Sequence, residues 1–143
     1  MQAKRFQKIL LAIDGSEHSK KATDYAVMLA KLCEAEIMLV HSRRRIPDFI
    51  GEPYYQRMLD RIQQKTREMF QPFCETLDGA GVKYEEIILD GDPANDIGTV
   101  ATVESCDLIV MGARGLSDFQ GILMGSVSHK VLQTTSCPVL TVR

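Results

Sequence analysis

Residues 82–111 read VKYEEIILDGDPANDIGTVATVESCDLIVM, and this pattern places one helix between two strands. The runs 82–89 and 107–111 are short enough for strands, and the second is so evenly apolar that we expect it to be buried on both faces. Between them, Asp92 is suited to the N-cap of a helix and Pro93 to its first helical position. A strand–helix–strand unit of this kind joins two parallel strands.

The same alternation continues on both sides of this unit. The run KILLAID at 8–14 is bounded by an Asp-Gly-Ser turn signal, which favours a strand. The other expected strands are 36–42 and 139–142. Three other helices are expected: one begins at Ser16 or Ser19, one follows the exposed connection 43–53, and one runs from Ser126 to about Thr135. Strands that alternate with helices predict an α/β fold, in which a parallel sheet carries helices on both faces. We therefore predict a single domain over residues 1–143.

The helix after residue 53 carries Pro72 within its apolar stripe. Proline has no backbone N–H to donate, so a kink or a break is expected there. The helix is expected to stop at the sequence Asp78-Gly79-Ala80-Gly81.

The composition is that of an ordinary globular domain, with 143 residues, 45% of them hydrophobic and 25% charged. A net charge of −2 gives no electrostatic reason to expect nucleic acid or an anionic membrane as a partner. No apolar run approaches the length of a membrane span, and the N-terminal stretch MQAKRFQKIL lacks a signal-peptide core. We expect a cytoplasmic protein.

The four cysteines are far apart and form no CxxC or Cys/His cluster, so neither a metal site nor a disulfide framework is predicted. We expect them to be small side chains in or near the core. They are Cys33, Cys74, Cys106 and Cys137.

The segment 111–130, MGARGLSDFQGILMGSVSHK, follows the strand 107–111 and is rich in glycine. Glycines let a ligand approach main-chain N–H groups, and the free N–H groups at the start of the next helix favour an anion. The expected phosphate donors are the glycines 112, 115 and 125, the hydroxyls of Ser126 and Ser128, and the charge of Arg114. These features predict a two-part phosphate cradle joined by residues 116–124, which we name the flap. The alternative is a structural loop whose glycines serve only turns and a cap.

Two familiar phosphate-binding loops are absent from the sequence. No G-x4-G-K-[ST] motif occurs, and no G-x-G-x-x-G follows the first strand. A phosphate site in this chain would instead lie after the fourth strand, where ligands of open parallel sheets bind beyond the carboxyl ends of the strands.

In the glycine-rich segment, Gly112 is followed by two residues and Gly115, and then by nine residues and Gly125-Ser126. This spacing matches G-2x-G-9x-G-[ST], the signature of the nucleotide-binding branch of the universal stress protein family, which the chain resembles. The resemblance also covers KILLAIDGSEHS, LVHS, GDPANDI, CDLIVMGARG and the terminal SCPVLTVR, and so spans the whole chain. It implies a doubly wound, Rossmann-like sheet of five parallel strands in the order 3-2-1-4-5, and it implies ATP as a ligand.

The resemblance also implies roles for individual residues. Asp14, at the end of the first strand, would contact the ribose, and adenine would pack between the ends of the first two strands. The implied cofactor-binding residues are Ala12, Ile13, Asp14, His41 and Ser42 on the nucleoside side, and Met111, Gly112, Arg114, Gly115, Gly125, Ser126 and Val127 on the phosphate side. No catalytic residue is predicted.

Asp14 has a second reading from the sequence alone. Aspartate at the start of a turn commonly accepts a hydrogen bond from a backbone N–H two or three residues later, here that of Ser16 or Glu17. In the ligand site, the same carboxylate is a candidate partner for a Mg²⁺ that the phosphates carry.

Four functions compete at this point. The leading hypothesis is an ATP-binding, homodimeric stress-response module with little or no turnover, and the alternative is a slow ATP hydrolase or phosphoryl-transfer enzyme. A receiver domain is disfavoured because a single acid, Asp14, follows the first strand and no lysine loop follows the last. An adaptor without nucleotide remains. The short apolar strand 139–142 is the expected homodimer seam, because edge strands invite pairing and the resembled family dimerises there.

Overall fold

The computed structural model describes residues 5–116, 118–119 and 121–143. Strands and helices alternate along the chain. They are β1 (Lys8–Ala12), α1 (Glu17–Cys33), β2 (Glu36–Arg43), α2 (Tyr54–Ala80), β3 (Tyr84–Asp90), α3 (Pro93–Val103), β4 (Leu108–Gly112), α4 (Ser126–Thr134) and β5 (Val139–Val142).

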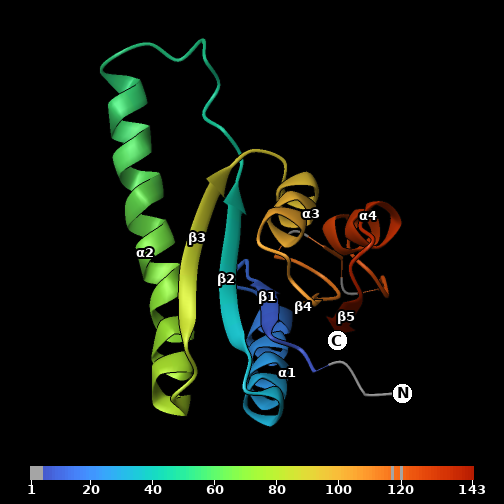
Figure 1. Ribbon diagram of the computed structural model, residues 1–143. Coiled ribbons are helices and arrows are strands. Elements are labelled where there is room, and N and C mark those ends of the chain that lie inside the picture. The colour runs from blue at the N-terminus through green and yellow to red at the C-terminus, as the bar shows by residue number, and fades with distance from the viewer. Residues whose placement is uncertain (1–4, 117, 120) are drawn as a thin grey trace.

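The five strands form one parallel sheet in the order β3-β2-β1-β4-β5 (Figure 1), which confirms the predicted fold class and strand order. The central strand β1 pairs with β2 on one side and with β4 on the other, so Ala12 lies opposite both Val40 and Met111. The carboxyl ends of these three strands are therefore neighbours. The chain leaves β1 in one direction and returns to its other side at β4, and this reversal is where such sheets bind ligands.

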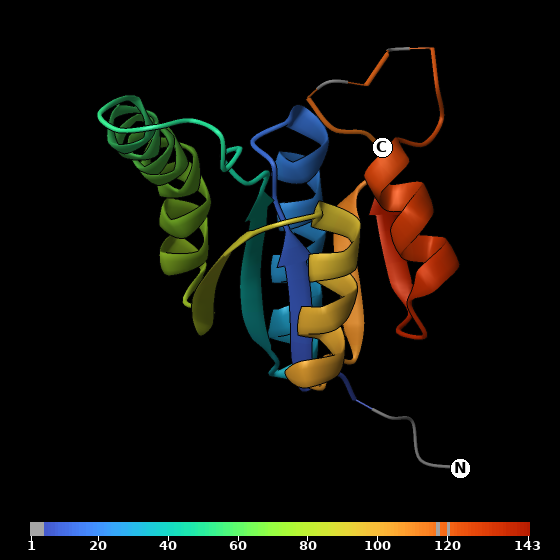
Figure 2. The same cartoon turned by 90° about the horizontal axis from the view of Figure 1, so that it is seen from above.

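Two hydrophobic cores cover the two faces of the sheet. On one face, α1 and α2 bury alanines and aromatic rings, among them Ala22, Ala26, Phe70 and Phe73. On the other face, α3 and α4 pack through side chains such as Ile97 and Val131. Figure 2 shows α1 and α3 on opposite sides of β1. Because both faces are covered, β1 and β4 are buried along almost their whole length, as the apolar run 107–111 predicts.

Local capping chemistry sets where two of the helices begin. Ser16 is the N-cap of α1, and its Oγ accepts the Ser19 N–H at 3.2 Å. Asp92 is the N-cap of α3, where its Oδ2 accepts the Asn95 N–H at 3.1 Å. Both starts agree with the sequence prediction.

The helix α2 continues through Pro72, so the predicted alternative of a break at this residue is wrong. Proline removes one intrahelical hydrogen bond, but the buried Phe70, Phe73 and Leu77 hold the helix on the sheet on both sides of it. The helix ends after Ala80, where Gly81 caps it with a φ of 71°, as the glycines there predict.

Among the described residues, no helix has both the length and the apolar character that a membrane crossing requires.

Candidate functional site

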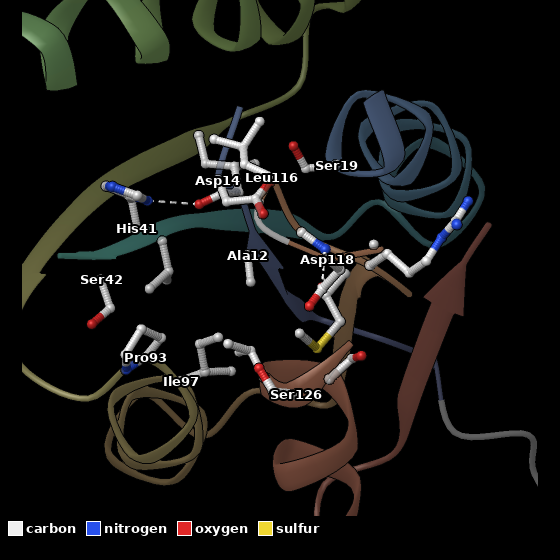
Figure 3. A pocket seen from close by; sticks show the side chains of 18 residues that line it. Ala12, Asp14, Ser19, His41, Ser42, Pro93, Ile97, Leu116, Asp118 and Ser126 are labelled. Atoms are coloured by element: carbon white, nitrogen blue, oxygen red, sulfur yellow. Dashed lines mark hydrogen bonds between the residues drawn. The ribbon is translucent and has the colours of Figure 1, made fainter. Parts of the chain in front are cut away.

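A cleft with a volume of about 280 Å³ lies at the carboxyl ends of β1, β2 and β4 (Figure 3). It contains eleven of the twelve predicted site residues. These are Ala12, Ile13, Asp14, His41, Ser42, Met111, Gly112, Arg114, Gly115, Ser126 and Val127. The twelfth, Gly125, is buried next to this group, beside the Cα of Arg114. The volume is close to the lower end of the roughly 300–1,000 Å³ of small-molecule sites.

One half of the cleft is an apolar slot. Ala12, Val40 and Met111 line it at neighbouring strand ends. Pro93 and Ile97 of α3 lie across the slot from Ala12 (Figure 3). A flat, largely apolar ring fits between such walls, because burying its faces removes apolar surface from water.

His41 lies at the edge of this slot, where its contacts are structural. Its Nδ1 lies 2.8 Å from the carbonyl oxygen of Ile13, so Nδ1 carries the proton and donates it. Its ring also meets Phe70 edge-on, with the centroids 6.2 Å apart. Burial lowers the pKa of His41, which keeps the ring neutral. The histidine thus ties the end of β2 to the end of β1.

Ser42 is held in place by α3. Its hydroxyl donates to Oδ2 of Asp96 at 2.6 Å, so this lining side chain is held by a bond to the protein.

Asp14 makes the turn contact that the sequence predicts and also lines the cleft, where its contact with a ligand stays a prediction. Its Oδ1 accepts the Ser16 N–H at 2.9 Å, as a turn aspartate does. Its Oδ2 reaches the opposite loop, where it would lie 2.7 Å from a Cβ built on Gly115. The carboxylate therefore stands between the slot and the glycine loop, and only a glycine at position 115 leaves room for it.

The other half of the cleft is formed by the glycine loop and the start of α4. No side chain caps α4, and the Ser126 and Val127 N–H groups have no acceptor among the residues that the structure describes. Those two donors remain available at the positive end of the helix. The Gly125 N–H, in contrast, donates to the carbonyl oxygen of Ala113 at 2.6 Å, which anchors the far end of the flap to the end of β4.

Ser128 lines the cleft, but its hydroxyl already bonds to the protein, so its role as a phosphate donor stays a prediction. The hydroxyl is buried and donates to the carbonyl oxygens of Ala113 and Gly125, at 2.7 and 3.1 Å. The Gly125 carbonyl is within reach because it belongs to the N-cap of α4, three residues before Ser128.

Arg114 lies at the cleft mouth and contacts both α1 and the flap. Its guanidinium donates to the carbonyl oxygen of Phe119 at 3.4 Å, and its Nη2 lies 3.0 Å from Nε2 of His18. Its backbone N–H lies 3.3 Å from Nδ1 of the same ring. The two histidine contacts need opposite tautomers, so one forms at a time. Partial burial, and then the Arg114 charge, lower the pKa of His18, and the neutral ring can accept a bond from Arg114.

Sequence reasoning missed several residues that line the cleft. They are Ser19, Val40, Pro93, Ile97, Leu116 and Asp118. Pro93 and Ile97 had a signal, because positions four apart on the first turns of α3 face the same side. Asp118 had none, since its place depends on how the flap folds back.

Within the described ranges, no three or more His, Cys, Asp or Glu side chains gather as metal ligands do. Residues 117 and 120 of the flap lie outside those ranges.

The chain is similar to known proteins over nearly its full length. The model of the universal stress protein family matches residues 5–143. A universal stress protein of Thermus aquaticus, encoded in the QAH/OAS sulfhydrylase 3′ region, is 39% identical over 139 residues, which are 96% of this chain and 99% of that protein.

Solved structures share the fold. Protein MJ0577 of Methanocaldococcus jannaschii superposes with a TM-score of 0.87 at 27% identity, covering 97% of this chain and 96% of that one. A universal stress protein in complex with cAMP has a TM-score of 0.75 at 24% identity, over 98% of both chains. One from Archaeoglobus fulgidus in complex with dAMP has a TM-score of 0.72 at 20% identity, over 98% of this chain and 100% of that one.

Proposed function

Because the chain belongs to the universal stress protein family, we propose that it binds adenine nucleotides, with ATP as its ligand, and acts as a stress-response module. The observation that carries the proposal is the pairing of an apolar slot with a helix N-terminus whose Ser126 and Val127 N–H groups have no acceptor in the described part of the chain. The cAMP and dAMP complexes of two structural neighbours support the same ligand class.

In this proposal the adenine ring enters the slot between Ala12, Val40 and Ile97. The ribose lies at Asp14, whose Oδ2 faces the glycine loop. The phosphates reach the N–H groups of Ser126 and Val127, where the helix dipole favours negative charge.

A Mg²⁺ carried by the phosphates fits the same place. Magnesium keeps several of its waters and commonly takes one or two carboxylates together with phosphate oxygens. Asp14 supplies such a carboxylate at the edge of the cradle.

We propose that the nucleotide acts as a signal rather than as a substrate. His41 donates to Ile13 and Ser42 to Asp96, so two polar side chains of the cleft are committed to holding its shape. A slow hydrolase or phosphotransferase is the alternative. Phosphate release by the purified protein at the rates of ordinary kinases would overturn the proposal that turnover is slow or absent.

The test is an equilibrium titration with ATP of the wild type and of the double variant Gly115→Ala/Gly125→Ala. The added methyl groups would fill space that Asp14 and Asp118 oxygens and the incoming phosphates need. The control is Gly121→Ala, the same change within the flap, where an added Cβ meets nothing within 4 Å. We expect weaker ATP binding by the double variant only, and equal affinities would rule out the cradle.

We further propose that two copies pair through β5, in the cytoplasm of the cell. This strand is at one edge of the sheet, and Val139, Leu140 and Thr141 are each only partly buried. Edge strands with free backbone groups pair readily with another chain.

Native mass spectrometry tests the pairing. The Pro138 carbonyl oxygen accepts a bond from Ile109 of β4, and the Val142 carbonyl oxygen accepts one from Ala113, just after β4. By the alternation of a strand, the Thr141 N–H therefore faces the open edge. Thr141→Pro removes that donor, and we expect a dimer for the wild type and a monomer for the variant. A wild type that is monomeric, or a variant that still dimerises, would contradict this seam.

A further inference from the structure

The Asp118 carboxylate occupies the place where the proposed phosphates would bind. Its Oδ2 accepts the Gly115 N–H at 2.5 Å. The same oxygen is so close to Gly125 that a Cβ on this glycine would collide with it. The two glycines stand at opposite ends of the flap, so the chain places its own anion between the two halves of the cradle.

The Asp118 carboxylate lies where an oxygen of a bound phosphate would lie in the proposed cradle. It is bound by a main-chain N–H of the glycine loop and lies beside the first turn of α4, where negative charge is favoured. A phosphate oxygen would use the same kind of donor, because charge-assisted bonds to main-chain N–H groups suit both anions. The carboxylate and a ligand phosphate therefore cannot hold this place together.

The other described residues of the flap, 116, 119 and 121–124, make few close contacts with the protein. Leu116, Phe119 and Leu123 are 73%, 82% and 71% exposed, so moving the flap uncovers little apolar surface. The Asp118 N–H donates to the Gly115 carbonyl at 3.4 Å, and Arg114 donates to the Phe119 carbonyl also at 3.4 Å. The 2.5 Å bond of the Asp118 carboxylate is the shortest hydrogen bond of the flap among the described residues.

We propose that Asp118 is a specificity-determining residue that competes with the phosphates of the ligand for the cradle. This inference rests on the proposed nucleotide-binding function. A nucleoside fills the apolar slot and leaves Asp118 bound to Gly115. A nucleotide with a phosphate chain displaces the carboxylate and thereby releases the flap.

The variant Asp118→Asn separates charge from shape, since asparagine keeps the size of the side chain and one acceptor oxygen. If the carboxylate fills the cradle about nine-tenths of the time, the apparent affinity for a phosphate ligand is reduced about tenfold. We expect Asp118→Asn to bind ATP about tenfold more tightly than the wild type and to bind adenosine with an unchanged affinity.

The control for net charge is Glu17→Gln. Glu17 is an exposed residue of the first turn of α1 that pairs with Lys20, and its replacement changes the charge by the same amount. Isothermal titration with ATP and with adenosine compares the three proteins. Amide hydrogen exchange then reports the flap: in the absence of ligand, the Gly115 N–H should exchange faster in Asp118→Asn than in the wild type.

Three results would overturn the inference and leave nucleotide binding intact. The first is that Asp118→Asn and the wild type bind ATP with equal affinity. The second is that Asp118→Asn binds Mg²⁺-ATP more weakly, as expected if Asp118 is a metal ligand. The third is that Asp118→Asn binds ATP more tightly but its Gly115 N–H exchanges no faster, as expected if Asp118 only repels the phosphates. If the wild type binds neither ATP nor adenosine, the proposed function fails and this inference fails with it.

Discussion

Replacing Ser126 by proline would remove one proposed phosphate donor and leave the helix in place. Ser126 is the first residue of α4, where a helix has no internal acceptor for the N–H. Proline is well suited to this position. The residue before it, Gly125, has φ −78° and ψ 168°, an extended conformation that a following proline accepts. The substitution therefore deletes an N–H at little structural cost.

The expected loss follows from the kind of bond removed. A hydrogen bond to a charged group contributes about 1.5–3 kcal/mol, and the exposure of Ser126 favours the lower figure. Ser126→Pro should therefore weaken ATP binding about tenfold, while the free energy of unfolding changes by less than about 1 kcal/mol.

Isothermal titration of the wild type, Ser126→Pro and Ser126→Ala separates the N–H from the hydroxyl. Alanine removes the hydroxyl, which is also an expected phosphate donor, and keeps the N–H, so it should bind ATP more tightly than the proline variant. Urea unfolding checks that α4 is intact. A proline variant that is folded and binds ATP as tightly as the alanine variant would refute the reasoning, as would an alanine variant that loses as much affinity as the proline one.

Three further predictions concern stability. Burial lowers the pKa of His41 below its ordinary 6.5, so on acidification the imidazole is protonated in the unfolded chain before it is protonated in the folded one. The free energy of unfolding should therefore fall from about pH 6.5 down to the folded pKa, by at most about 1.4 kcal/mol per pH unit. Urea unfolding at pH 7.5 and 5.5 should show a smaller pH effect for His41→Asn than for the wild type. Pro72→Ala should raise the free energy of unfolding by about 2 kcal/mol, because an alanine restores a hydrogen bond inside α2, and an unchanged urea midpoint would contradict this. Leu77→Ala should lower it by about 2–5 kcal/mol, since Leu77 is 0% exposed, and a loss below 1 kcal/mol would mean that α2 is not part of the core.

Much of the fold could be predicted because its signals are local. Asp92 and Pro93 start α3 through capping chemistry that acts within one turn, and Gly81 ends α2 through its own backbone conformation. The alternation of strands and helices then restricts the sheet to parallel pairing. The strand order came from the resemblance to a family, because periodicity alone does not say which strands are neighbours.

What could not be predicted depends on packing or on the return of the chain in space. Pro72 favours a break locally, but Phe70 and Phe73 are buried on either side and keep α2 whole. The bond of the Ser128 hydroxyl to the Ala113 carbonyl joins residues fifteen positions apart, so sequence alone does not reveal it. Asp118 enters the cradle only because the flap folds back onto Gly115, which is a contact of tertiary structure.

The candidate site was predicted as a set of strand ends and loop residues, and the structure gathers eleven of those twelve residues in one cleft. Their contacts with a ligand stay predictions.

The most direct test of the central claim follows the backbone N–H resonances of Gly115, Ser126 and Val127 in isotope-labelled protein during titration. The account predicts large shifts of these three resonances with ATP and small ones with adenosine, whereas resonances of the apolar slot around Val40 respond to both. If ATP binds while the N–H groups of Ser126 and Val127 do not respond, the phosphates lie elsewhere and the account is contradicted.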